Sequence, residues 1–252
     1  MSEGSGEKPQ GATGRWERNA RPPIIGNLNV NRFVRTPAGE LMLRRKPKEN
    51  PKLFEALRKE YTFLGFFEAG GEVRQRSPQE QEEFAVHARQ EGLRVVAPLR
   101  RILEVTYVPF LEHAQTLDDS LPMQDEGQTK ELLRQLFSDL ATAHGKKIVY
   151  GDRWSKNVLI DDKEGIAHID FDLELDGEVA KVFELAQITY YVLCAIDQAR
   201  IPILADCIKK HSAQDYDPTL FAQFVRRHAS YFQASARYAA PPEAVEALLG
   251  LL

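Results

Sequence analysis

The stretch "YGDRWSKNVLIDDKEGIAHIDFD", residues 150–172, contains two short apolar segments that predict a β-hairpin. Val158–Ile160 and Ala167–Ile169 have the composition of strands, and the polar residues between them are typical of a turn. Four polar residues flank this hairpin: Asp152 and Asn157 before its first strand, and Asp170 and Asp172 after its second. A purely structural hairpin needs none of these four, so the stretch predicts a functional site.

The spacing of these polar residues fits phosphoryl transfer from ATP. Asn157 follows Asp152 by five residues, and Asp170 follows Asn157 by thirteen. Phosphoryl transfer needs a carboxylate to orient and deprotonate the acceptor hydroxyl, and oxygen ligands to hold Mg²⁺ on the phosphates. A loop before one strand and a turn after its hairpin partner can deliver such groups into one cleft, because the strand pair fixes their separation.

In these residues the sequence resembles the protein-kinase-like superfamily, whose catalytic loop carries an Asp with an Asn five residues on and whose DFG-type element carries a second metal ligand. The resemblance implies that Asp152 is the catalytic base, that Asn157 and Asp170 bind the metal, and that ATP and Mg²⁺ are the cofactors. Asp172 is either a third acid of the metal site or a cap for the next segment.

The departures from the protein-kinase pattern point to small atypical members of the superfamily. Tyr150-Gly151-Asp152 replaces His-Arg-Asp, Asp170-Phe171-Asp172 replaces DFG, and no Ala-Pro-Glu follows. These features resemble the aminoglycoside-type phosphotransferases, the lipopolysaccharide (Kdo and heptose) kinases, and the RIO-like and tRNA-modification-complex kinases. The order of segments over residues 40–117, a basic strand, an aromatic-rich insert, a Glu-bearing helix and a "GLRVVAPL" strand, is similar to that of the lipopolysaccharide kinases. The short segment after Asp172 leaves little room for an ordinary activation segment.

The residues that hold ATP are harder to identify from the sequence. The resemblance implies a Lys–Glu pair, for which we expect Lys46 at the end of "ELMLRRK" and Glu83 in the helix expected over 78–91, with Glu82 one position away. If "EVRQR" is the strand next to that helix, the cation is instead an arginine, Arg74 or Arg76. No GxGxxG motif is present, so the nucleotide loop is not assigned.

Lys156, four residues after Asp152, is a further catalytic candidate. Its ammonium group can neutralise charge on the transferring phosphoryl group. The alternative is an ordinary solvated lysine in a loop, and the sequence favours neither.

The remaining patterns predict an α+β protein of two lobes. Strand and hairpin signals dominate residues 24–113, the expected nucleotide-binding lobe, and long apolar periodicities dominate residues 114–252, the expected helical lobe with the catalytic loop and the metal-binding hairpin. Within the second lobe, residues 182–196 are apolar almost all round, which is typical of a buried helix. Residues 1–23 are rich in Gly, Ser, Glu and Pro and predict a disordered tail.

Composition limits the partners. The net charge of −4 argues against a sequence-independent nucleic-acid binder, although it leaves room for a local basic patch. No apolar stretch reaches the length of a membrane span and the N-terminal residues do not form a secretory signal, so we expect a cytoplasmic protein. The two cysteines, Cys194 and Cys207, lack metal-ligand spacing and suggest a reducing compartment.

Together these features predict an ATP- and Mg²⁺-dependent kinase that acts on an unknown hydroxyl-bearing acceptor, with a sugar or another small molecule favoured. An atypical serine/threonine protein kinase is one alternative. A pseudokinase that serves as a binding module is another, since the lysine is uncertain and the glycine-rich loop is missing.

Overall fold

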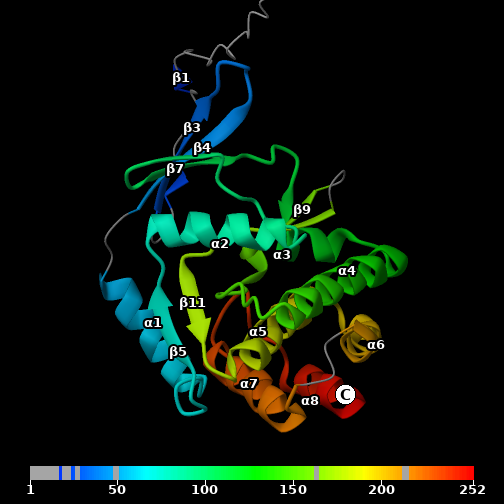
Figure 1. The fold of residues 1–252 in the computed structure, drawn as a ribbon. Helices are drawn as coiled ribbons and strands as arrows, with labels where there is room; N and C mark the ends of the chain where they lie inside the picture. Colours follow the sequence, from blue (N-terminus) through cyan, green and yellow to red (C-terminus); the bar gives the residue numbers. More distant parts are fainter. Residues whose placement is uncertain (1–16, 19–23, 26–28, 48–50, 162–164, 212–215) are drawn as a thin grey trace, which may run out of the picture.

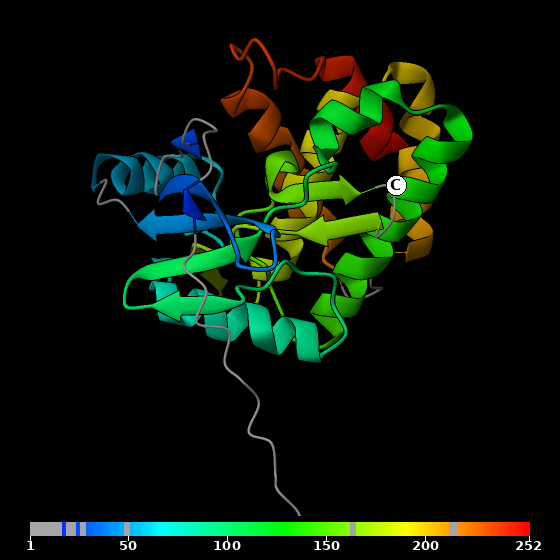
Figure 2. The ribbon, with the colours of Figure 1, turned by 90° about the horizontal axis from the view of Figure 1, so that it is seen from above.

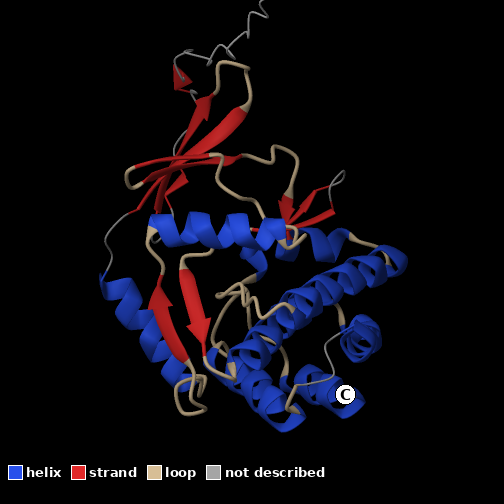
Figure 3. Cartoon of the chain, in the orientation of Figure 1, coloured by secondary structure: helices blue, strands red, loops and turns tan. Residues whose placement is uncertain are grey.

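The computed structural model describes residues 17–18, 24–25, 29–47, 51–161, 165–211 and 216–252. In that part of the chain the strands of the largest sheet gather at one end and most of the helices at the other, where the strands β5 (Glu72–Gln75) and β11 (Leu173–Asp176) also lie (Figures 1 and 3). This arrangement confirms the predicted α+β fold of two lobes. No helix among these residues is both long enough and apolar enough to span a bilayer.

The N-terminal lobe is built on a six-stranded antiparallel sheet with the order β1-β3-β4-β7-β6, to which β2 adds by pairing with β3. Its strands are β1 (Glu17–Arg18), β2 (Ile24–Ile25), β3 (Asn29–Arg35), β4 (Leu41–Pro47), β6 (Arg100–Ile102) and β7 (Val105–Pro109). The β3–β4 hairpin turns at Gly39, whose φ of 85° suits glycine. The sequence predicted a disordered tail over residues 1–23, but Glu17 and Arg18 of this segment form strand β1. The rest of residues 1–23 lies outside the described residues.

Two helices and a short strand separate β4 from β6. Helix α1 (Pro51–Phe63) is followed by β5 (Glu72–Gln75) and by α2 (Pro78–Gln90). Helix α2 begins at a capping box in which Ser77 and Glu80 bind each other's backbone N–H groups. Strand β5 does not join the large sheet; it pairs with β11 (Leu173–Asp176), so residues 51–77 reach into the C-terminal lobe, where α1 contacts α7 (Figure 1).

The C-terminal lobe packs around one buried helix. Helix α5 (Ala180–Ala195) is buried over nearly its whole length, as its apolar sequence predicted. The other helices of the lobe are α3 (Leu117–Ser120), α4 (Glu126–Gly145), α6 (Ile201–His211), α7 (Pro218–Tyr231) and α8 (Pro242–Leu251). Viewed from above, they lie to one side of the large sheet (Figure 2).

The predicted hairpin is present between the lobes. Strand β9 (Val158–Asp161) pairs antiparallel with β10 (Gly165–His168), and β8 (Gln115–Thr116) adds on the other side of β9. The chain before β6 joins this hairpin to the N-terminal lobe, because Val95 bridges His168 and the Val96 N–H donates to the His168 carbonyl at 2.9 Å. The hairpin thus fixes the residues on either side of it against both lobes.

Candidate active site

The loop that carries Asp152 is held by polar side chains of the buried helix α5. Gly151 donates its N–H to Glu184 at 2.9 Å, and Arg153 donates its N–H to the side-chain oxygen of Gln187 at 2.7 Å. Gln187 also donates to Asp152 Oδ1 at 2.8 Å. Because Glu184 and Gln187 are three residues apart, they lie on the same face of the helix. This face of α5 therefore fixes the position of the loop backbone at Gly151 and Arg153 and of the Asp152 carboxylate.

Gly151 is required by the close approach of the next strand. Its φ is 108°, and a Cβ at this position would lie 2.1 Å from the Leu173 carbonyl oxygen. We expect Gly151→Ala to lower the free energy of unfolding by about 2 kcal/mol or more, through backbone strain and this overlap. Urea unfolding would measure it. Gly250→Ala is the control, because no atom lies within 4 Å of that added Cβ; equal urea midpoints for the two variants would contradict the prediction.

Arg153 is a site residue that the sequence analysis missed. Its side chain is fully buried, and it donates to the carbonyl oxygens of Asn157, Ile169 and Asp170 at 3.3, 3.1 and 3.1 Å. Its Nε lies 3.8 Å from Glu184, which balances its charge. Arg153 therefore ties the loop before the hairpin to the turn after it. The available signal was Glu184 itself, a lone acid in an apolar helix, which needs a buried cation.

Asn157 and Asp170 are brought together by these contacts. The Asn157 side chain donates through Nδ2 to the Asp152 carbonyl at 2.9 Å, which leaves its amide oxygen available as a ligand. The Ile169 N–H donates to the Asn157 carbonyl at 3.0 Å. Asp170 has a φ of 61°, in the left-handed region that costs a non-glycine residue about 1 kcal/mol, and the bonds from Arg153 hold it there.

Arg45 of β4 is the cation that reaches this turn. Its guanidinium donates to Oδ1 of Asp170 and, at 2.8 Å, to Oδ1 of Asp172. Burial alone would raise the pKa of Asp170, but the charge and hydrogen bond of Arg45, a hydrogen bond with Asp172 and the charge of Arg153 together lower it. For Asp172, burial and the neighbouring Asp170 raise the pKa to about 7. The Asn29 side chain donates to the second oxygen of Asp172 at 2.8 Å.

Lys46 and Glu83, the expected ATP-binding pair, do not meet. Lys46 is exposed and follows Arg45 in the strand, so the two side chains lie on opposite faces of the sheet. Glu83 is also exposed and accepts a hydrogen bond from Gln79. The Arg45 side chain, by contrast, is 18% exposed and reaches Asp170.

The alternative basic residues, Arg74 and Arg76, lie beside the C-terminal lobe. Arg74 is exposed and pairs with Glu80 and Glu174. Arg76 is buried and donates to the backbone carbonyls of residues 150, 171 and 173. It therefore stabilises the backbone just before Asp152 and on either side of Asp172 through these carbonyls rather than through a site carboxylate. Lys156 is half-buried with its ammonium 5.4 Å from the centre of the Trp154 ring.

Helix α1 adds residues beside Asp152 that no sequence signal indicated. The Tyr61 hydroxyl makes a long contact of 3.5 Å with Asp152 Oδ1. Burial and the charge of Asp152 raise the pKa of Glu60 to about 7. Burial likewise raises the pKa of Asp152 to about 6, against the opposing charge of Arg153. Asp152 is therefore ionised at neutral pH but gains a proton readily just below it.

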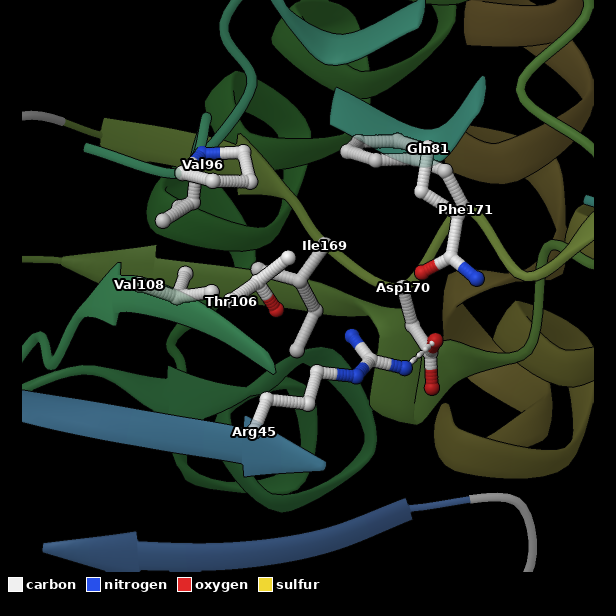
Figure 4. A pocket seen from close by; sticks show the side chains of 9 residues that line it. Arg45, Gln81, Val96, Thr106, Val108, Ile169, Asp170 and Phe171 are labelled. Carbon is white, nitrogen blue, oxygen red and sulfur yellow. Dashed lines mark hydrogen bonds and ion pairs between the residues drawn. The ribbon is translucent and has the colours of Figure 1, made fainter. Parts of the chain in front are cut away.

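A pocket lies between β4, β7, α2 and the turn at Asp170 (Figure 4). Arg45 and Asp170 form its charged end, and Val96, Val108 and Ile169 contribute its apolar walls. A concave, mostly apolar site with a few polar groups is typical of small-ligand binding.

The donor set fits Mg²⁺ held partly by a nucleotide. No cluster of three or more His, Cys, Asp or Glu residues suited to a metal occurs in the described ranges. Mg²⁺ does not need one, since it is commonly bound through one or two protein oxygens together with phosphates and water. The Asp170 carboxylate, with its side chain 37% exposed, and the Asn157 amide oxygen would supply such ligands.

The order of these elements is the one expected from the resemblance found in the sequence: an antiparallel sheet with α2, a hairpin flanked by the site residues, and a buried supporting helix. The sequence matches no protein-family model, and no curated protein matches it either.

Two solved structures with which the chain shares similarity are of the Rio2 kinase from Chaetomium thermophilum. One is its ADP/Mg²⁺-phosphoaspartate complex, 16% identical, with a TM-score of 0.48 over 93% of this chain and 70% of that chain. The other is the Rio2 kinase structure, 14% identical, with a TM-score of 0.49 over 93% of this chain and 71% of that chain.

Proposed function

We propose that this protein is an ATP- and Mg²⁺-dependent phosphotransferase that acts on a hydroxyl group. The observation that carries the proposal is one connected set of contacts at the hairpin. The Asn157 side chain binds the backbone of Asp152, Arg153 binds the backbones of Asn157 and Asp170, and Arg45 binds the carboxylate of Asp170. A carboxylate base, two oxygen ligands and a cation are the groups that phosphoryl transfer requires.

Asp152 is the proposed general base. It is anchored by Gln187 at 2.8 Å, and its pKa of about 6, raised by burial, leaves it ionised at neutral pH. A base whose pKa lies near the working pH accepts a proton most effectively. Asp152 would orient the acceptor hydroxyl and take its proton as the oxygen attacks phosphorus.

Arg45 is the proposed phosphate-binding cation, in place of Lys46. It emerges from the strand that faces Asp170, whereas Lys46 is exposed. Its planar guanidinium can bind a carboxylate and a phosphate at once, because its donors point in several directions. Asp170 and Asn157 would hold Mg²⁺, which neutralises charge on the phosphates. Lys156 remains a candidate for the acceptor side, since it lies on the same loop as Asp152.

A sugar or another small-molecule acceptor is favoured over a protein. Residues 51–77 pack against the C-terminal lobe, and Tyr61 contacts Asp152 from α1. Strand β11, which begins directly after Asp172, pairs with β5. The backbone of this segment is therefore already paired and is not available to bind a peptide. A peptide acceptor would need an open surface beside Asp152, whereas a small alcohol needs only access to its carboxylate.

One observation favours a second candidate, a pseudokinase that binds partners without catalysis. The expected metal ligand Asp170 is already bound by Arg45. If that pair persists in solution, Mg²⁺ cannot take the carboxylate, and the fold would act as a binding module.

The test is nucleotide binding and transfer with and without Mg²⁺. We expect ATP with Mg²⁺ to raise the melting temperature of the protein, because a ligand that binds only the folded state stabilises it. In Asp170→Asn the Mg²⁺-dependent part of this shift should vanish, and transfer of radiolabel from ATP should fall by about a hundredfold or more. Asp206→Asn, at an exposed Asp206–Lys210 pair, is the control.

The outcomes separate the candidates. Label in the small-molecule fraction of a sugar mixture supports the proposal, and label on protein supports a protein kinase. ATP binding without any transfer, or no binding at millimolar ATP, favours the pseudokinase. Undiminished Mg²⁺-dependent transfer by Asp170→Asn would overturn the assigned mechanism.

A further inference from the structure

We propose that Asp172, rather than an acid of helix α2, is the partner that positions Arg45 for the nucleotide phosphates. This inference rests on the proposed function and concerns the same site. It starts from a physical requirement: a cation as buried as Arg45, whose side chain is 18% exposed, needs a fixed carboxylate to balance its charge.

Helix α2 does not supply that carboxylate. Its acids bind elsewhere: Glu80 accepts from Arg74 at 2.7 Å, Glu82 from Arg101 at 2.6 Å, and Glu83 from Gln79 at 2.8 Å. The α2 side chain that lines the pocket is the neutral Gln81, on the wall opposite Arg45 with Asp170 between them (Figure 4). Gln81 donates to the Arg76 carbonyl at 3.0 Å.

Asp172 has the properties of a fixed partner. Its side chain is 8% exposed; one oxygen accepts from Arg45 at 2.8 Å and the other from Asn29 at 2.8 Å. Its backbone carbonyl accepts from the Arg76 N–H at 2.7 Å, next to the β5–β11 pairing. Both the main chain and the carboxylate of Asp172 are therefore held in place.

Asp170 has a held main chain too, through Arg153, but its carboxylate is more exposed. Its side chain is 37% exposed, and its hydrogen bond to Arg45 can be exchanged for a metal. When Asp170 is given up to Mg²⁺, Asp172 still holds Arg45. The Nε of Arg45 is buried and has no hydrogen-bond partner in the described part of the chain. A buried donor of this kind favours an acceptor such as a phosphate oxygen.

The two carboxylates thus have different roles: Asp172 holds the Arg45 guanidinium, and Asp170 can exchange its bond to Arg45 for a bond to Mg²⁺. The third residue of "DFD" provides the acidic partner that the resemblance led us to expect from Glu83. Of the two alternatives for Asp172 that the sequence left open, neither includes this role.

The test is the dissociation constant for ATP, with and without Mg²⁺, measured by calorimetry on the full chain. We expect Asp172→Asn to weaken ATP binding roughly tenfold to a hundredfold, the range for a lost hydrogen bond between charged groups. The KM for ATP should rise more than kcat falls. Asn29→Leu, which removes only the second hydrogen bond, should weaken binding less and is the variant to use if Asp172→Asn does not fold.

A rescue separates positioning from general stability. The double variant Asp172→Asn with Gln81→Glu adds a carboxylate to the pocket that Arg45 also lines, and we expect it to restore part of the lost affinity. Glu83→Gln should bind ATP like the unchanged protein.

Each outcome decides one of the two proposals. If the unchanged protein binds ATP and transfers its phosphate, but Asp172→Asn and Asn29→Leu each bind ATP equally well, the proposed role of Asp172 is wrong and the proposed phosphotransferase function is unaffected. If Glu83→Gln weakens binding instead, the helix supplies the partner after all. If the unchanged protein binds no ATP, both proposals fall.

Discussion

Asp152→Asn is expected to abolish phosphotransfer and at the same time to stabilise the protein above pH 6. Removing a general base lowers turnover by about 10²- to 10⁴-fold. The gain in stability has a separate cause. Burial raises the pKa of Asp152 to about 6, so the folded protein binds this proton more tightly than the unfolded chain does. Above that pH the folded protein carries a carboxylate whose ionisation costs free energy.

The pH dependence gives the prediction its sign. The cost of ionising Asp152 is absent below about pH 4, the ordinary pKa of an aspartate, and develops in full as the pH rises through about 6. Asparagine carries no charge and keeps the oxygen that accepts from Gln187. We expect Asp152→Asn to raise the free energy of unfolding by about 1–2 kcal/mol at pH 8 and to leave it unchanged at pH 4.

Urea unfolding at the two pH values, together with radiolabel transfer from ATP, measures both effects. The kcat/KM of the unchanged protein should also rise with pH through about 6. Asp161→Asn, on strand β9 away from the loop, is a suitable comparison at a partly exposed aspartate. Loss of stability at pH 8 in Asp152→Asn would show that the carboxylate supports the fold, and would contradict its assignment as a strained base.

Arg153→Met is expected to cause the largest loss of stability, about 3–5 kcal/mol. Removing one member of a buried ion pair leaves the other charge uncompensated, and this is costly in a dry interior. Here the variant would remove the guanidinium from the fully buried Glu184, which would keep only its hydrogen bonds with His144 and Gly151. It would also leave three backbone carbonyls without the donor that Arg153 now supplies. The turn at Asp170 would lose its support, so ATP-dependent activity should fall as well.

Urea unfolding again provides the measurement. Arg134→Met is the matched control, because Arg134 pairs with Glu131 on an exposed helix surface, where such pairs contribute little. The double variant Arg153→Met with Glu184→Gln should recover part of the loss, since it removes the stranded charge. A loss below about 1 kcal/mol in Arg153→Met would be incompatible with the ion pair that the structure contains.

The hairpin and the polar residues around it could be predicted from the sequence. Strand composition and turn residues locate β9 and β10 within a few positions, because these signals are local in the chain. The positions of Asp152, Asn157 and Asp170 relative to the strands follow from short sequence distances, so their convergence could be predicted. The buried helix α5 could be predicted for the same reason, since its apolar character is continuous.

Which basic and acidic side chains meet at the proposed site could be read only from the tertiary structure. Arg45 and Lys46 are neighbours on β4, and a shift of one residue moves a side chain to the other face of a sheet. The sequence does not say which face is covered by the second lobe. The same holds for Glu83, whose direction depends on how α2 packs, and for Arg153, whose burial depends on Glu184 of a distant helix. These choices depend on contacts between segments far apart in the chain, and such contacts leave no periodic signal in the sequence.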